Sequence, residues 1–165
     1  MTFIAQSIRL VIDLLMRIAS AIAPPVLRIA LAVPFLKSGL TKWTGFLSLS
    51  PAATFLFESQ FKLHIFGAVY SMPDPALLAL VDSVAEVVLP ILLIVGLATR
   101  FSALGLLIMT GVIQLVVPEG WANFHLPWAA LAVAIIALGP GAFSLDRLIK
   151  QWAPSWVKLS NHLSS

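Results

Sequence analysis

The feature that most constrains this chain is an apolar run, Ala76 to Ala98, that carries two acidic residues one helical turn apart. As a helix, a run of this length can cross the hydrocarbon core of a bilayer. An ionised carboxylate near the middle of a membrane costs about 2.5 to 3.5 kcal/mol on insertion scales and normally faces a bundle interior, where a cation meets it. We therefore expect Asp82 and Glu86 to face a polar centre, with Lys37 and Lys42 as candidate cations.

Composition places the rest of the chain in the same environment. Sixty per cent of the 165 residues are hydrophobic and only ten per cent are charged, whereas about a quarter of the residues in soluble domains are charged. There is room for four spans of about 20 residues each, so we predict an all-α membrane protein with a four-transmembrane-helix bundle. The net charge of +3 comes from scattered cations. The predicted partner is membrane lipid, and no nucleic-acid role is indicated.

Two kinds of chemistry are disfavoured by residue type. The chain contains no cysteine, so thiol chemistry would need a partner protein. Its three histidines, His64, His125 and His162, fall in a loop, at a helix start and in the tail. We therefore expect no haem-ligating pair and predict no metal site.

The first segment, residues 1–23, has its own pattern. Arg9, Asp13 and Arg17 recur every fourth position on one face, and apolar side chains occupy the others. This is typical of an amphipathic helix that lies in the membrane interface. A fifth spanning helix is the alternative. A signal peptide is disfavoured, because charges interrupt the apolar stretch and no convincing small-residue cleavage site follows.

The second segment, residues 24–149, is predicted to hold the four-helix transmembrane domain. A connector, residues 47–75, is too polar and broken to span, and its phenylalanines favour a short helix or hairpin folded over the bundle mouth. Residues 150–165 form a charged, aromatic tail. The four spans are expected at residues 25–46, 75–98, 101–117 and 124–138. The second is predicted to open with Asp74 as its N-cap and Pro75 at the first helical position, and to end within residues 96–100.

The distribution of cations predicts the orientation. With both termini cytoplasmic, seven cations lie at the inner side and only Lys37, Lys42 and Lys62 lie on the outer half. This satisfies the positive-inside rule. The connector and the loop before the last span would then face outward.

Depth matching suggests how the polar centre is paired. In antiparallel neighbouring helices, Lys37 lies level with Glu86, and Lys42 lies level with Asp82. The two lysines are about 140° apart around a helix axis, so both cannot face one stripe. We expect Lys37 to be the partner near the midplane, because Lys42 is near enough to the outer interface to snorkel. An ion-paired staple is the structural alternative to a proton relay or ligand site.

Four further residues are assigned structural roles. Pro34 and Pro90 fall at one level of the predicted bundle, and each removes a backbone hydrogen bond from its helix. The freed carbonyl groups either make a polar cavity beside Glu86, or the prolines simply bend the helices around a packed core. Arg28 and Arg100 mark the inner edge.

Gln114 and His125 fall in the outer half of the bundle and are candidates to line an outward-opening pocket. The alternative role for Gln114 is a buried interhelical hydrogen bond, and the alternative for His125 is a helix cap or a position at the membrane interface.

Four stretches of the chain resemble the DoxX family of small bacterial integral membrane proteins. They are RIALAVPFLKSGLTKW, AEVVLPILLIVGLATRFSALGLL, VIQLVVPEGW and LGPGAFSLDRL, and the resemblance covers about residues 28–149. It implies a four-helix bundle in the bacterial inner membrane. It also implies that Lys37, Lys42, Glu86 and Arg100 occupy the family's usual polar positions, and no catalytic residue is carried over.

The resemblance also implies a range of functions. Related proteins are associated with quinone-linked oxidation of sulfur compounds, with thiol or oxidant stress, and with copper-handling secretion systems. We expect an accessory subunit of a redox or metal-stress system that binds a quinone or small ligand. Its partners would belong to a redox or copper-handling assembly, and one expectation is a non-catalytic subunit of a quinone-linked oxidoreductase. The alternative is a small proton-coupled transporter or a scaffold without catalytic activity.

Overall fold

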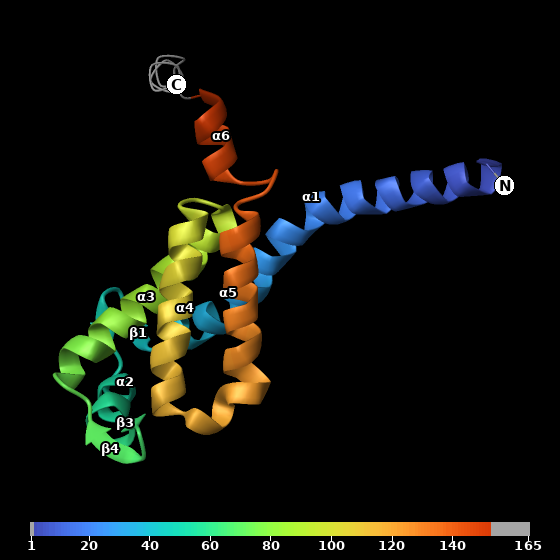
Figure 1. Ribbon diagram of the computed structural model, residues 1–165. Coiled ribbons are helices and arrows are strands. Elements are labelled where there is room, and N and C mark those ends of the chain that lie inside the picture. The colour runs from blue at the N-terminus through green and yellow to red at the C-terminus, as the bar shows by residue number, and fades with distance from the viewer. Residues whose placement is uncertain (1, 153–165) are drawn as a thin grey trace, which may run out of the picture.

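The computed structural model describes residues 2–152, and its elements are mostly helices (Figure 1). Four segments are long and apolar enough to cross a membrane, so the chain is a multi-pass membrane protein and the predicted four-helix bundle is confirmed. The helices of these segments are α1 (Thr2–Thr41), α3 (Pro75–Val95), α4 (Thr99–Val116) and α5 (Leu126–Leu138). The tail beyond residue 152, with Lys158 and His162, lies outside the described residues.

Helix α1 is continuous from Thr2 to Thr41, through two prolines at positions 24 and 25. The amphipathic segment and the first span are therefore one helix, whose N-terminal half projects sideways from the bundle (Figure 1). The helix ends five residues before the predicted Phe46, because the chain turns at Lys42, whose N–H donates to the Gly39 carbonyl (3.1 Å).

The predicted start and end of the second span are confirmed. Asp74 caps α3, its Oδ1 accepting from the N–H of Leu77 at 3.2 Å, and Pro75 occupies the first turn, where its missing N–H does no harm. The helix ends at Gly96, which adopts a left-handed conformation with φ of 73°. Glycine tolerates that conformation without steric cost.

The connector, residues 43–73, forms a compact cap at the end of the bundle opposite α6 (Figure 1). We name it the outer cap, and the opposite end the inner end, after the predicted orientation. The outer cap contains both a short helix and a hairpin, as predicted. Its elements are β1 (Trp43–Gly45), β2 (Ser48–Leu49), α2 (Pro51–Phe55), η1 (Leu56–Gln60), β3 (Lys62–Ile65) and β4 (Ala68–Ser71). The β1–β2 and β3–β4 pairs are antiparallel.

The core of the bundle lies in its middle and inner parts. Small alanine side chains at buried positions allow the helices to approach closely. Such close packing is typical of membrane helices, because helices surrounded by lipid gain no hydrophobic free energy by associating. The largest apolar side chains that are almost completely buried there are Leu31, Phe35, Leu93, Leu106 and Ile135.

The inner end is closed by the turn after α5 and by α6 (Leu145–Trp152). Both carboxylate oxygens of Asp146 accept backbone hydrogen bonds, from the N–H groups of Ala98 (2.8 Å) and Thr99 (2.9 Å). Asp146 thus satisfies free donors at the start of α4. The buried Arg28 donates from Nη2 to the carbonyl oxygen of Phe143. The two contacts join α6 and its preceding turn to the bundle.

Asp146 makes the stability of this end depend on pH. Partial burial alone would raise its pKa, but the hydrogen bonds from the N–H groups of Thr99 and Ala98 outweigh burial, and the pKa lies below its ordinary value. A carboxyl with a lowered folded-state pKa contributes stability above its unfolded pKa of about 3.9, and this is lost as the pH falls through the folded value.

We predict that Asp146→Asn lowers the free energy of unfolding by about 0.5 to 2 kcal/mol at pH 7, the usual range for losing a helix cap. The difference from wild type should shrink below about pH 4, where the wild-type carboxyl also becomes neutral. Thermal unfolding in detergent at both pH values measures this. Equal unfolding temperatures at pH 7 would show that the cap contributes nothing.

Candidate functional site

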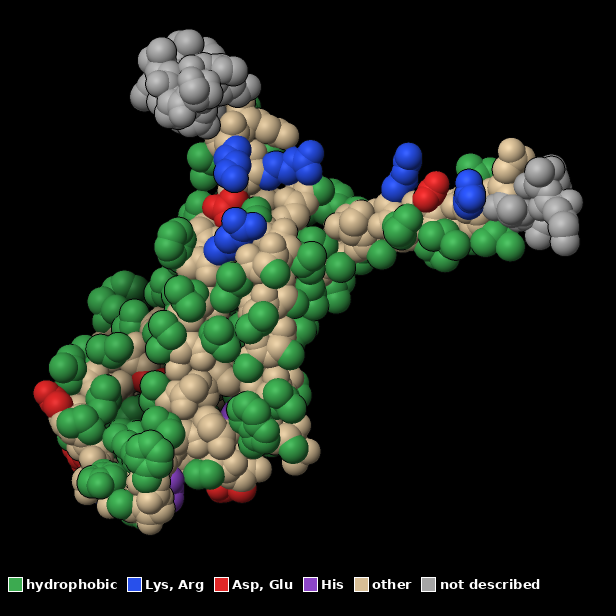
Figure 2. Space-filling model, viewed as in Figure 1, with side chains coloured by type: hydrophobic (Ala, Val, Ile, Leu, Met, Phe, Trp, Pro, Cys, Tyr) green, Lys and Arg blue, Asp and Glu red, His purple; other side chains and the backbone are tan. Residues whose placement is uncertain are grey.

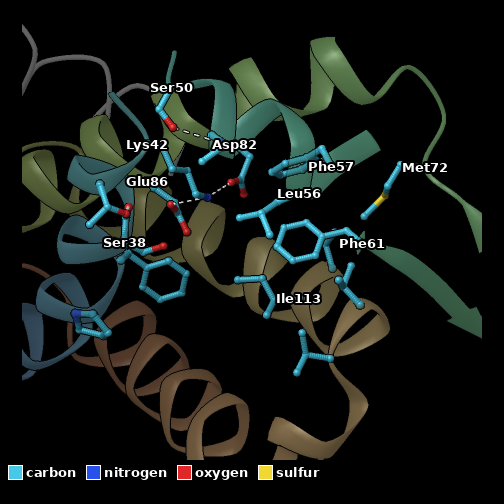
Figure 3. A pocket seen from close by; sticks show the side chains of 18 of the residues that line it. Ser38, Lys42, Ser50, Leu56, Phe57, Phe61, Met72, Asp82, Glu86 and Ile113 are labelled. Carbon is cyan, nitrogen blue, oxygen red and sulfur yellow. Dashed lines mark hydrogen bonds and ion pairs between the residues drawn. The ribbon is translucent and has the colours of Figure 1, made fainter. Parts of the chain in front are cut away.

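A cation held between two carboxylates forms the polar centre of the bundle (Figure 3). Lys42, just past the end of α1, donates from Nζ to Oδ2 of Asp82, and the same Nζ lies 2.6 Å from Oε2 of Glu86. Both acids project from α3, and Glu86 is only 4% exposed. We call these three side chains the Lys42 triad.

The structure corrects the predicted pairing of Lys37 with Glu86. Lys37 is exposed and forms no ion pair with any residue between 2 and 152. The two lysines diverge by about 140° around α1, and it is Lys42 that faces α3. Because α1 ends at Thr41, Lys37 lies one turn from the outer end of the helix instead of near the midplane.

A glycine allows the two helices of the triad to touch. A Cβ atom placed on Gly39 of α1 would lie 2.8 Å from the Cβ of Glu86 and 2.9 Å from its carbonyl oxygen. Real Cβ atoms do not approach so closely, so any other residue at position 39 would push α1 away from α3 at the level of the triad.

A cavity of about 420 Å³ lies between the triad and the outer cap (Figure 3). This volume falls within the usual range for small-molecule sites. Its polar wall comprises Ser38, Thr41, Ser50 and the Lys42 triad. The other walls are apolar and partly aromatic, and they include Phe35, Phe57, Phe61, Met72, Ile113 and Trp128.

The outer cap contributes directly to this cavity. Phe57 is buried, stacks edge-on against Phe61 with 5.0 Å between ring centroids, and lies 5.7 Å from Nζ of Lys42. The ring face therefore contacts the charged end of the triad in a cation–π arrangement. The phenylalanines of the connector predicted a fold over the bundle mouth, but nothing in their spacing identified which of them would line a cavity.

Gln114 and His125 do not line this cavity and instead bond to each other beside it. Nδ1 of the buried His125 lies 2.6 Å from Oε1 of Gln114, whose Nε2 donates to the carbonyl oxygen of Pro118 at 3.1 Å. Because an amide oxygen can only accept, Nδ1 of His125 carries the proton. The imidazole packs on Trp128, which does line the cavity, with 5.6 Å between ring centroids.

The residues assigned structural roles are spread along the bundle. Pro34 lines the cavity, whereas Pro90 is buried one turn beyond Glu86 on α3. Arg28 and Arg100 lie at the inner end, far along the helices from the triad; Arg28 is buried, and Arg100 is exposed. Within residues 2–152, no group of three or more histidine or acidic residues could hold a metal ion.

Comparison with known proteins identifies one family. The DoxX family model matches residues 23–119, which include the Lys42 triad and the whole outer cap. An uncharacterized protein of Haemophilus influenzae (strain ATCC 51907 / DSM 11121 / KW20 / Rd) is 32% identical over 164 aligned residues, covering 86% of this chain and 93% of that protein. No solved structure matches the chain significantly.

We predict that Lys42→Met destabilises the protein by about 3 to 5 kcal/mol, because it leaves the buried Glu86 and the partly buried Asp82 side by side without their cation. Lys37→Met, on the same helix but exposed, is the matched control and should change the unfolding temperature little. Adding Asp82→Asn and Glu86→Gln to Lys42→Met should restore most of the loss. A larger fall in the unfolding temperature for Lys37→Met than for Lys42→Met would show that the triad does not stabilise the bundle.

Proposed function

Since the chain belongs to the DoxX family of membrane proteins, we propose that it is an accessory subunit of an inner-membrane redox or metal-stress system and binds a quinone or similar lipophilic ligand. The observation that carries the proposal is the cavity of about 420 Å³ with apolar, partly aromatic walls and the Lys42 triad on one side. Sites for small molecules combine such apolar walls with a few convergent polar groups.

The polar wall offers both kinds of hydrogen bond that a quinone headgroup needs. The ammonium group of Lys42 is a donor suited to a carbonyl oxygen, and the carboxylate of Glu86 is an acceptor suited to the hydroxyl of a reduced ring. Glu86 lines the cavity, and one of its oxygens, Oε2, lies 2.6 Å from Nζ of Lys42. A carboxylate has two oxygens and about four lone pairs, so a Glu86 that holds Lys42 can also accept from a ligand hydroxyl.

The aromatic walls suit the ring itself. Phe35, Phe57 and Trp128 project into one cavity from α1, the outer cap and α5. Aromatic rings pack favourably against one another in offset or tilted arrangements. The site lies in the outer half of a bundle surrounded by lipid, so a membrane-soluble ligand needs no aqueous route to reach it.

The alternative, a proton-coupled transporter, also uses the buried acids, since intramembrane carboxylates often belong to proton relays. Packing below the cavity favours the binding role. The buried side chains of Leu31, Leu93, Leu106 and Ile135 fill the bundle between the triad and the inner end. A transport path would require these helices to separate.

The proposal includes an orientation in the bacterial inner membrane with both termini cytoplasmic. The exposed cations Arg100, Arg147 and Lys150 lie at the end of the bundle opposite the outer cap (Figure 2). Such an excess of cations is typical of the cytoplasmic side. Partner proteins from a redox or copper-handling assembly would meet the subunit from either surface.

We predict that the purified protein binds a short-chain quinone in its reduced form, which carries hydroxyl groups, and that Glu86→Gln weakens this binding about tenfold, the effect of losing one hydrogen bond to a charged group. Tryptophan fluorescence quenching measures the affinity, since Trp128 lines the cavity. Lys37→Met is the control and should bind as wild type does.

A second variant tests the cavity itself. Ala52 lines the cavity from the outer cap, whereas its neighbour Phe55 does not. Ala52→Trp should block quinone binding and Phe55→Trp should not, with both proteins eluting as wild type on size exclusion. Quinone affinity that neither Glu86→Gln nor Ala52→Trp alters would refute the proposal. Transport that loses its pH dependence in Glu86→Gln would instead support the transporter.

A further inference from the structure

The N-terminal half of α1, residues 2–23, forms an arm outside the bundle (Figure 1). The side chains of residues 6–20 are all exposed. At 100° per residue, the polar stripe of Gln6, Arg9, Asp13, Arg17 and Ser20 occupies only about 80° of the circumference. Large apolar side chains cover most of the remainder, among them Leu10 (70% exposed), Val11, Leu14, Leu15 and Ile18.

An apolar surface of this extent must be covered by something. A second copy of the arm would cover one side of the helix and leave the other apolar sides in water. Lipid can cover all of them at once and leave only the narrow polar stripe exposed, which is how interfacial helices lie. The arm is also continuous with the lipid-facing surface of the bundle, since α1 belongs to both.

The direction of the arm agrees with this arrangement. The arm leaves the inner end of the bundle and runs crosswise to the helices (Figure 1). Figure 2 shows its charged side chains on the side away from the bundle and a row of apolar side chains on the opposite side, above the lipid that would surround the bundle. The charged residues of the arm are Arg9, Asp13 and Arg17.

The bend that sets this direction is held by the bundle. Pro24 and Pro25 each lack the N–H that would continue the helical ladder, so α1 can bend there. Pro24 is buried against Gly141, where an added Cβ atom would lie 2.5 Å from the Cβ of the proline, and Gly141 has φ of 76°. One turn later, Arg28 donates to the carbonyl of Phe143. The inner turn thus holds the elbow from which the arm starts.

Charge indicates which lipid surface the arm meets. The arm and the inner end together expose five cations against two acids, and one of these acids, Asp146, is engaged at the start of α4. At the other end of the bundle, the outer cap, the N-cap residue Asp74 and the loop at residues 117–125 carry one cation, Lys62, against the acids Glu58, Asp74 and Glu119. A basic surface beside a membrane attracts anionic headgroups.

We propose that the arm is a lipid-docking element that lies along the inner leaflet and, together with Arg100, Arg147 and Lys150, binds the headgroups of anionic phospholipids. Its apolar side is buried at the boundary between headgroups and acyl chains. Arg9 and Arg17 face the headgroups from the polar stripe. This inference does not depend on any ligand in the outer cavity.

The absence of cysteine makes the position of the arm directly measurable, because single cysteines can be spin-labelled. Ile18→Cys and Ser20→Cys place labels on opposite sides of the arm, about 160° apart. In nanodiscs of phosphatidylcholine with phosphatidylglycerol, the label at position 18 should be accessible to oxygen and shielded from a nickel chelate, and the label at position 20 should show the reverse. Equal nickel access at both positions, or spin–spin coupling between copies, would overturn the proposal.

Lipid selectivity tests the charged part. Full-length protein in vesicles should favour spin-labelled phosphatidylglycerol over spin-labelled phosphatidylcholine, and this preference should fall about fivefold for each of Arg9→Gln and Arg17→Gln. Lys62→Gln, which removes a cation from the outer cap, should leave the preference unchanged. Two results would overturn the proposal that the arm binds anionic headgroups. One is the same lipid preference in the arginine variants as in wild type, and the other is an equal loss of preference in Lys62→Gln.

Discussion

The structure depends on one lysine held between two carboxylates inside an otherwise apolar bundle. Lys42 joins the outer end of α1 to α3 through Asp82 and Glu86, and Gly39 brings the two helices into contact at the same level. Three charges at one point would be costly to bury unless they compensated one another. All three side chains line the cavity, so the feature that holds the helices together also makes the cavity polar.

Local signals in the sequence predicted the helices well. Asp74-Pro75 and Gly96 define both ends of α3, because a side-chain cap and a left-handed glycine act within a few residues of the chain. The site was harder to predict. Depth matching correctly placed Lys42 level with Asp82, but the choice between two lysines depended on where α1 ends, and the turn at Lys42 is set by the cap that follows.

The cavity walls depend on long-range contacts that no local pattern reveals. Phe57 and Met72 reach the cavity only because the connector folds back onto the bundle, and Trp128 reaches it from the last span. Gln114 and His125 were candidates for the same pocket, yet they bond to each other beside it. Two polar residues in the same half of a bundle can satisfy each other as readily as they can face a ligand.

The most direct test of the central claim is the infrared difference spectrum of a quinone with ¹³C-labelled carbonyl groups bound to the purified protein. Hydrogen bonding from the ammonium group of Lys42 should lower the stretching frequency of one labelled carbonyl relative to the same quinone in hydrocarbon. Both carbonyls at their hydrocarbon frequency would contradict the account, because the ligand would then lie away from the triad.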